Sequence, residues 1–201
     1  MPQFCFLWGC MGGKKMNVTE YAGLITGEIA DTLGKVSPED GEKLTDMILD
    51  AKKIFVAGAG RSGMAARAFA MRLMHMGFES YVCGETITPS LEAEELFIVA
   101  SGSGSTASLV SMTQKAEKIG AQIATVTICP EGPIGRIADL AVEIPAPTPK
   151  ARVKNKTVSV QPMGSLFEQC AFIFFDSVIL RLMEKRGISS DKMFTRHANL
   201  E

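Results

Sequence analysis

The hydrophobic positions of the chain change their period several times, which predicts helices and strands in alternation. Two opening stretches carry apolar residues at helical spacing, and the second starts with Ser37, Pro38 and two acids, a typical helix start. The predicted helices are 17–33, 37–50, 61–76, 105–119 and the short stretch 134–138, and the predicted strands are 53–58, 80–83, 96–100, 122–128 and 140–144. From residue 53 onward, strand–helix alternation indicates a parallel sheet with helices on both faces.

The last third of the chain departs from this alternation. A proline-rich turn at 145–149 ends it, and the basic residues 150–160 predict a flexible loop. Residues 162–185 predict one long helix that is apolar nearly all round. We therefore expect this helix to be buried on every side and to form part of a subunit interface. A last short helix, capped by Ser190-Asp191, is expected to carry His197.

Residues 1–16 differ from the rest of the sequence. Their apolar run is too short to cross a bilayer. Lys14 and Lys15 follow that run, whereas a secretory signal carries its positive charge before it. We interpret 1–16 as a misassigned start or an expression leader, and we place a single domain at 17–201. The sequence has no run of 18 apolar residues, so we expect a soluble protein with no membrane partner.

Composition and charge narrow the class of protein. The 201 residues, 46% hydrophobic and 21% charged, fit one globular domain. Lys and Arg number 21 and Asp and Glu 22, so the chain lacks the basic surplus that binding to nucleic acid requires. Two His and five scattered Cys without a C-x-x-C pair argue against a metal site and a disulfide framework. They indicate reduced thiols in the cytoplasm.

A glycine-rich turn, GAGRSG at 58–63, follows the first predicted strand. Its glycines let backbone N–H groups approach an anion, and the start of the next helix adds a positive dipole end. The turn has neither a clean G-x-G-x-x-G dinucleotide fingerprint nor the G-K-[ST] of a phosphate-binding P-loop. A purely structural role, as a tight strand-to-helix turn, stays open.

A serine-rich loop, SGSGST at 101–106, follows the third predicted strand. Its hydroxyl and N–H donors suit a phosphate monoester, and the lack of acids argues against a bound cation. The alternative is a flexible turn with a helix cap. The two donor-rich turns end neighbouring strands, and ligands of open α/β sheets bind at that edge. Together they favour a ligand site.

Two further residues are candidates for proton transfer. Glu168 begins the long apolar helix, and Ser165-x-x-Glu168 fits a capping box, a structural role. A carboxylate at a partly dry site can instead act as a general base, and the residues leave both roles open. His197 lies in a polar terminus and can move a proton if that terminus reaches a site. His75 ends a predicted helix, where a cationic ring would interact with the helix dipole.

The glycine turn and the serine loop together resemble the sugar isomerase (SIS) domain family, in which the serine-rich loop holds a sugar phosphate. Within that family, five strings are similar to the 6-phospho-3-hexuloisomerase group. They are FAMRLMHMGF at 69–78, GETITPS at 84–90, SGSGST at 101–106, QPMGSLFEQ at 161–169 and RHANLE at 196–201. The resemblance covers about 17–201, all but the first sixteen residues.

This resemblance implies a three-layer α/β sandwich whose five-stranded parallel sheet has the flavodoxin-like order 2-1-3-4-5. It also implies a homo-oligomer, usually a tetramer, with sites near subunit boundaries and with no metal or cofactor. The implied reaction interconverts D-arabino-3-hexulose 6-phosphate and fructose 6-phosphate. That reaction belongs to formaldehyde fixation by the ribulose monophosphate pathway, and it would couple the protein to a 3-hexulose-6-phosphate synthase.

The same resemblance suggests residue roles. The residues expected to bind the substrate are Arg61, Ser62, Ser101, Ser103 and Thr106. The serines and Thr106 would hold the phosphate or sugar, and Arg61 would offset the charge of an enediolate. Glu168 would remove the proton from C2 of the 3-keto sugar. His197, from the same or a neighbouring chain, would shuttle protons among the oxygens.

Three alternative functions remain open at this point. One is an arabinose 5-phosphate isomerase of the same family, which often adds paired regulatory domains after the SIS domain. Another is a non-catalytic phosphosugar-binding regulator, which carries an N-terminal helix-turn-helix module. Residues 17–50 hold eight acids and two lysines, a balance poorly suited to DNA. The last is a dinucleotide-binding oxidoreductase, weakened by the imperfect glycine pattern.

Overall fold

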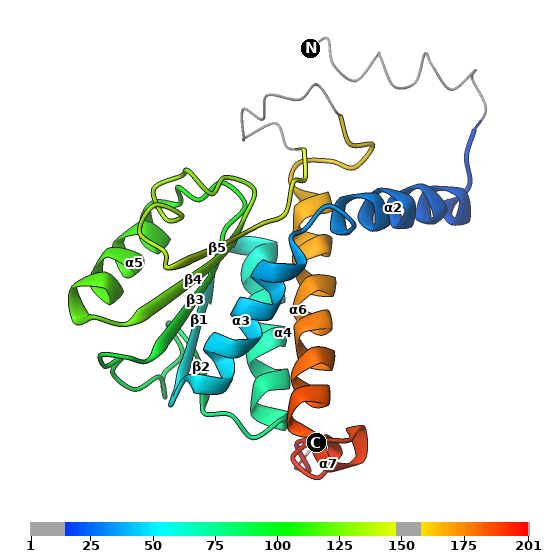
Figure 1. The fold of residues 1–201 in the computed structure, drawn as a ribbon. Helices are drawn as coiled ribbons and strands as arrows, with labels where there is room; N and C mark the ends of the chain where they lie inside the picture. The colour runs from blue at the N-terminus through cyan, green and yellow to red at the C-terminus, as the bar shows by residue number, and fades with distance from the viewer. Residues whose placement is uncertain (1–14, 148–157, 201) are drawn as a thin grey trace.

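A five-stranded parallel sheet lies at the centre of the computed structural model, which describes residues 15–147 and 158–200 (Figure 1). The strands are β1 (Ile54–Gly58), β2 (Ser80–Val82), β3 (Leu96–Ala100), β4 (Gln122–Thr127) and β5 (Leu140–Glu143). Their order is β2-β1-β3-β4-β5, and all four neighbouring pairs are parallel. The predicted sheet and its order are confirmed. Most of the predicted leader 1–16 and of the loop 150–160 lies outside the described residues.

Helices cover both faces of the sheet, as expected for a three-layer sandwich. One face carries α5 (Ala107–Ile119), and the other carries α3 (Pro38–Asp50), α4 (Gly60–His75) and α6 (Ser165–Arg186) (Figure 1). Helix α2 (Val18–Leu33) extends away from the sheet beside the start of α6, and α7 (Ser190–Phe194) follows the end of α6. None of the helices within the described ranges has the length and hydropathy that a membrane crossing requires.

The alternation of side chains along β1 explains why the sheet needs cover on both sides. Ile54 and Val56 point into the larger core, which α3, α4 and α6 complete. Phe55 and Ala57 point into the smaller core under α5. All four side chains are at most 4% exposed, so the strand is apolar throughout rather than alternating in polarity.

Local capping chemistry confirms several predicted boundaries. The Asn17 side chain accepts the N–H of Glu20, while the Glu20 carboxylate accepts the N–H of Asn17, a reciprocal capping box at the start of α2. The Ser37 hydroxyl accepts the N–H of Asp40, and Pro38 occupies the first position of α3. Helix α5 ends at Gly120, whose φ of +86° is the left-handed conformation typical of a glycine stop.

Two predicted elements near the sheet and at the C-terminus are wrong in detail. Residues 134–138 form turns instead of a helix: the Ile134 carbonyl accepts the N–H groups of both Ile137 and Ala138. The glycines and proline at 132–135 favour such turns over a continuing helix. The cap of α7 is Ser189 and not Ser190, and the helix ends before His197.

The long helix α6 departs from the prediction at its start, and its outer face is uncovered within one chain. It begins at Ser165, three residues late, because Gly164 is its N-cap residue. Of the two roles left open for Glu168, the capping box with Ser165 is not formed, since no side chain caps this helix. Within one chain Phe172 and Leu180 are 44% and 66% exposed, and the predicted burial of this helix at a subunit interface stays a prediction.

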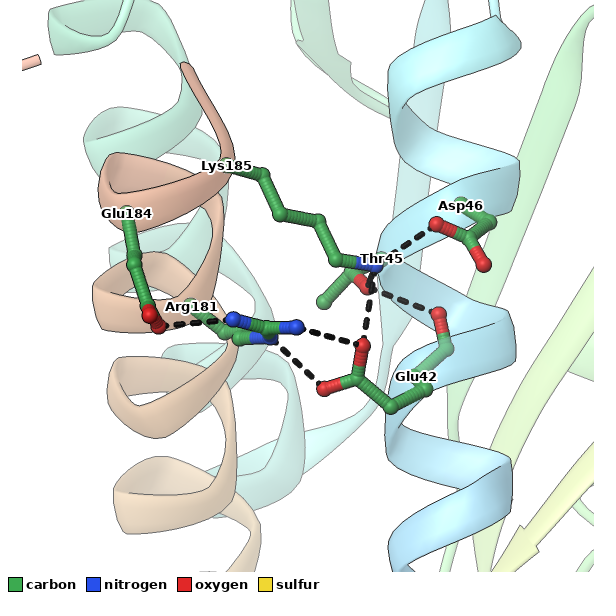
Figure 2. A network of polar contacts seen from close by, with 6 residues as sticks. All are labelled: Glu42, Thr45, Asp46, Arg181, Glu184 and Lys185. Atoms are coloured by element: carbon green, nitrogen blue, oxygen red, sulfur yellow. Dashed lines mark hydrogen bonds and ion pairs between the residues drawn. The ribbon is translucent and has the colours of Figure 1, made fainter. Parts of the chain in front are cut away.

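A network of ion pairs fastens α6 to α3 (Figure 2). Arg181 donates through Nε to Glu42 Oε1 at 2.7 Å and through Nη1 to Glu184 Oε2 at 2.7 Å. Lys185 Nζ lies 2.6 Å from Asp46 Oδ1, 2.8 Å from the Thr45 hydroxyl oxygen and 3.0 Å from Glu42 Oε2. These contacts anchor the helix whose first turns carry Glu168.

Candidate active site

A cavity of ≈430 Å³ opens where the carboxyl ends of β1 and β3 meet the start of α6. Six of the seven residues predicted for the site line it: Arg61, Ser62, Ser101, Ser103, Thr106 and Glu168. The structure therefore brings the glycine turn, the serine loop and the predicted base together, although they are far apart in the sequence. This edge of a parallel sheet is where open α/β folds bind their ligands.

The glycine turn is built by close backbone approach. A Cβ atom on Gly58 would lie 2.8 Å from the Gly63 Cα atom, and one on Gly63 would lie 2.6 Å from the Gly58 carbonyl oxygen. Between them, Gly60 has a φ of +57°. The interpretation as a tight strand-to-helix turn is thus confirmed. The same turn also lines the cavity, with Ser62 only 9% exposed.

The serine loop is fixed to the sheet by its backbone. The Ser101 N–H donates to the Val126 carbonyl at 3.0 Å, and the Ile128 N–H donates to the Gly102 carbonyl at 3.1 Å. A Cβ atom on Gly102 would lie 3.0 Å from the Phe167 ring, so the first turn of α6 packs directly on the loop. The Ser103 hydroxyl accepts the N–H of Ser105 at 3.4 Å, a long bond that a ligand can replace.

Three helices begin at the cavity, and none of them is capped by a side chain. The N-cap residues of α4, α5 and α6 are Ala59, Thr106 and Gly164, and within the described residues none makes a side-chain cap bond. Side chains do cap α2, α3 and α7, whose starts are not part of the cavity lining. The positive dipole ends of three helices thus face the cavity, where they favour an anion, although the first N–H of α6, on Ser165, donates to the Pro162 carbonyl at 3.2 Å.

Glu168 lies one turn inside α6 and faces Arg61 across the cavity. Arg61 donates through Nε to Glu168 Oε2 at 2.5 Å. The Glu168 side chain is 21% exposed and that of Arg61 60% exposed, so the carboxylate is the more enclosed partner. This carboxylate does not cap its own helix; it pairs with Arg61 at the wall of the cavity. A carboxylate and a guanidinium therefore lie together at one side of the cavity.

His197 does not reach this cavity within one chain. Its ring stacks on His75 and Phe194, with centroids 5.5 and 5.7 Å apart. These residues lie near the far end of α6, which runs on for about 27 Å beyond Glu168 at the rise of an α-helix. Burial, with Arg72 and His197 as further causes, lowers the pKa of His75, so its neutral ring is favoured over the expected cation.

Met163, Gly164 and Phe167 are among the residues of the cavity wall that sequence reasoning did not identify. They belong to the string QPMGSLFEQ, of which only Glu168 was given a role in the reaction. Phe167 has the periodicity of a core residue, and only the close approach of Gly102 shows that it also faces the site. Among the described residues, no group of three or more His, Cys, Asp or Glu side chains could hold a metal ion. The expected absence of metal and cofactor stays a prediction.

A flavodoxin-like sheet with serine-rich and glycine-rich loops at its carboxyl edge is typical of the SIS domain, and this chain belongs to that family. The SIS domain model of the family matches residues 47–175. Among curated relatives, a Bacillus subtilis (strain 168) protein named 3-hexulose-6-phosphate isomerase is 48% identical over 186 residues, 92% of this chain and 100% of the relative. A Mycobacterium gastri protein of the same name is 42% identical over 185 residues, 92% of each chain.

A solved structure is also similar to this chain over most of its length. A Methanococcus jannaschii crystal structure, said to infer a molecular function of 3-hexulose-6-phosphate isomerase, matches this chain with a TM-score of 0.78. The two sequences are 38% identical, and the match covers 90% of this chain and 99% of that one. The similarity therefore extends over nearly the whole of both molecules.

Proposed function

We propose that this chain is an isomerase that interconverts D-arabino-3-hexulose 6-phosphate and fructose 6-phosphate. The observation that carries the proposal is the cavity in which three uncapped helix starts, the serine loop and Glu168 meet. One part of it suits a phosphate, and another offers a base for proton transfer. The two relatives named 3-hexulose-6-phosphate isomerase, at 42% and 48% identity, support the choice of substrate.

In this proposal the phosphate binds at the serine loop. Ser101, Ser103 and Thr106 donate hydroxyl hydrogen bonds, joined by N–H groups at the starts of α5 and α4. Ser62 contacts the phosphate or the sugar from the glycine turn. Binding at the phosphate holds the reacting carbons in place beside Glu168, where positioning lowers the barrier.

The chemistry is a proton transfer between adjacent carbons. Glu168 takes the proton from C2 of the 3-keto sugar, and the electrons of that C–H bond form the C2–C3 double bond of a cis-enediolate. Glu168 then returns the proton to C3 while the C2 hydroxyl proton passes to the anionic C3 oxygen, which gives the 2-keto sugar and restores the Glu168 carboxylate. One carboxylate serves both carbons because they are neighbours. Arg61, already beside Glu168, offsets the negative charge of the enediolate.

His197 completes the proposal as a proton shuttle among the sugar oxygens, supplied by a neighbouring copy. Its distance from Glu168 in one chain is what makes a second copy necessary. We infer a homo-oligomer, a tetramer by resemblance to the family, and the exposed Phe172 and Leu180 on α6 support such assembly.

The setting of the reaction follows from its chemistry. We place the protein in the cytoplasm, without a nucleic acid or membrane partner and without a metal or redox cofactor. Its substrate would come from a 3-hexulose-6-phosphate synthase, which joins formaldehyde to ribulose 5-phosphate in the ribulose monophosphate pathway. Functional coupling to such a synthase is part of the proposal.

One assay tests the reaction directly. The 3-hexulose phosphate is generated in place from formaldehyde, ribulose 5-phosphate and a synthase, and the appearance of fructose 6-phosphate is followed after the protein is added. We expect fructose 6-phosphate to form only when both proteins are present. No product above the synthase-only control would contradict the proposed function.

Isotope exchange then identifies the carbons that react. Incubation of fructose 6-phosphate with the protein in D₂O is expected to place deuterium at C3, because Glu168 removes the C3 proton in the reverse direction. An aldose–ketose isomerase would instead label C1, and hydride transfer to a dinucleotide would label neither. Nuclear magnetic resonance of the recovered sugar phosphate distinguishes these outcomes.

A further inference from the structure

The segment 158–164 forms a wall of the active-site cavity without belonging to a helix or strand. It ends in Met163 and Gly164, which both line the cavity. Met163 has a φ of +58°, in the left-handed region that residues other than glycine rarely adopt. Such a conformation persists only where the surroundings hold it. Val158 and Val160 are 69% and 40% exposed, so burial of these apolar side chains does not secure the segment.

Glu28 of α2 holds this segment by three hydrogen bonds. Its carboxylate accepts the Ser159 hydroxyl at 2.8 Å, the Val160 N–H at 2.8 Å and the Gln161 side-chain amide at 3.0 Å. The Gln161 N–H donates in turn to the Ser159 hydroxyl oxygen at 3.0 Å, and Gln161 is only 9% exposed. A charged acceptor that is bonded by donors from three consecutive residues holds a segment without regular secondary structure firmly in place. We call these three hydrogen bonds the clamp.

Gln161 is the last residue bonded to Glu28. It precedes Met163, which lines the cavity, by two residues and the proposed base Glu168 by seven. Gly164, the N-cap residue of α6, accepts the Glu168 N–H at 3.1 Å. A Cβ atom on Gly164 would lie 3.6 Å from Glu168 Oε1, so this backbone is in contact distance of the carboxylate. Glu28 itself does not line the cavity. Its three hydrogen bonds give it a route to the reaction through the segment that it holds.

We propose that Glu28 is a positioning residue that fixes the wall segment 158–164, and through it the surroundings of Glu168. The inference rests on the proposed isomerase activity for its kinetic readout. It also links α2, the helix that extends away from the sheet in Figure 1, to the reaction at the start of α6.

Two substitutions of graded severity test the proposal. Glu28→Gln keeps the shape but has one acceptor oxygen and one donor group, so it cannot accept all three bonds. Glu28→Ala removes the clamp. We expect kcat/KM for the 3-hexulose phosphate to fall about tenfold in Glu28→Ala and less in Glu28→Gln, with a rise in KM, because small misplacements at a site are costly. Asp31→Asn, a change at an exposed acid of the same helix, is the charge-matched control and should match the wild type.

The KM value separates positioning from a purely structural role. If Glu28 only stabilised the fold, its loss would lower the active fraction and hence kcat, and KM would stay unchanged. Ser159→Ala in the Glu28→Ala background should cost nothing further, because the two residues share one interaction. Wild-type kinetics in both Glu28 variants, or a fall in kcat alone, would overturn the proposal. Inactive wild-type protein would instead count against the proposed function.

Hydrogen exchange provides a readout that does not depend on activity. The Val160 N–H is bonded to Glu28 Oε1, so peptides covering 158–164 should exchange faster in Glu28→Ala than in the wild type or in Asp31→Asn. If Glu28→Ala fails to fold, Glu28→Gln provides the same comparison. Unchanged exchange in a folded Glu28 variant would overturn the clamp whatever the substrate of the protein.

Discussion

At the scale of single residues, the proposed reaction depends most on Glu168. Glu168→Gln keeps the size of the side chain and a hydrogen-bond acceptor for Arg61, but the amide cannot take a proton from carbon. We expect kcat to fall by about 10²–10⁴, the usual share of a general base, while KM changes little. Steady-state kinetics measure both constants. Near-normal turnover by a folded and assembled variant would rule out Glu168 as the base.

Substitutions in the serine loop should raise KM, whereas the Glu168 substitution should lower kcat. Replacement of Ser101 and Ser103 by Ala removes two hydroxyl donors from the cavity but leaves the backbone bonds of the loop intact. We expect KM for the phosphosugar to rise by about a hundredfold or more, since each lost bond to a charged group costs about 1.5–3 kcal/mol and about 1.4 kcal/mol is a factor of ten. Ser105→Ala, an exposed neighbour that does not line the cavity, is the control. Unchanged kinetics in the double variant would contradict phosphate binding at this loop.

The sequence patterns predicted where the candidate site lies better than they predicted what each residue does there. The serine and glycine turns could be placed from sequence because both follow apolar strands, and parallel strands end at one edge. The capping role of Ser165 could not be decided in the same way. Whether a side chain bonds to its own helix or to a distant partner depends on what packs against it. Here Arg61, more than a hundred residues away in the chain, takes the Glu168 carboxylate.

At the scale of elements, the contact between α3 and α6 makes stability depend on pH (Figure 2). Hydrogen bonds from Arg181, and then from Lys185, lower the pKa of Glu42 to about 2, from an ordinary value of 4.5. The folded state thus binds the Glu42 proton more weakly than the unfolded chain. The stabilisation is complete above about pH 4.5 and is lost as the pH falls towards 2.

Glu42→Gln should therefore lower the melting temperature at pH 7, and the difference from the wild type should shrink below pH 4.5. Added salt at pH 7 should reduce it as well, because the pairs are partly exposed. Thermal unfolding across this pH range measures the effect. Glu117→Gln, an exposed acid on α5, is the control. A deficit that stays constant from pH 7 to pH 3 would contradict the assignment to the Glu42 charge.

The elements themselves were largely predictable because their signals are local. Ser37 and Pro38 start α3, and Gly120 ends α5, without reference to the rest of the molecule. The prediction of a helix at 134–138 is wrong because the apolar residues there have helical spacing, whereas Gly132 and Gly135 lie in turns. The conformation of this stretch depends on packing: a Cβ atom on Gly135 would lie 2.0 Å from the Pro130 carbonyl oxygen.

At the scale of the whole molecule, apolar side chains remain exposed on the two helices that pack side by side. Met64, Met71 and Met74 on α4 are 67%, 45% and 41% exposed, and Phe172 and Leu180 on α6 are similarly uncovered. An apolar surface on helices near the site is what an assembly of identical chains would bury. Such an assembly also allows the C-terminal residues of one copy to approach the cavity of another.

A mixing experiment tests whether the reaction uses two chains. Glu168→Gln and His197→Asn variants, each expected to be nearly inactive alone, are co-expressed with different tags, and mixed oligomers are purified. If Glu168 and His197 come from different copies, about a quarter of randomly assembled sites regain both residues and the same fraction of wild-type activity. If both come from one chain, no mixed site is complete and activity stays at the level of the single variants. That second outcome would contradict the separation of the two residues along α6, and full activity of His197→Asn alone would remove His197 from the mechanism.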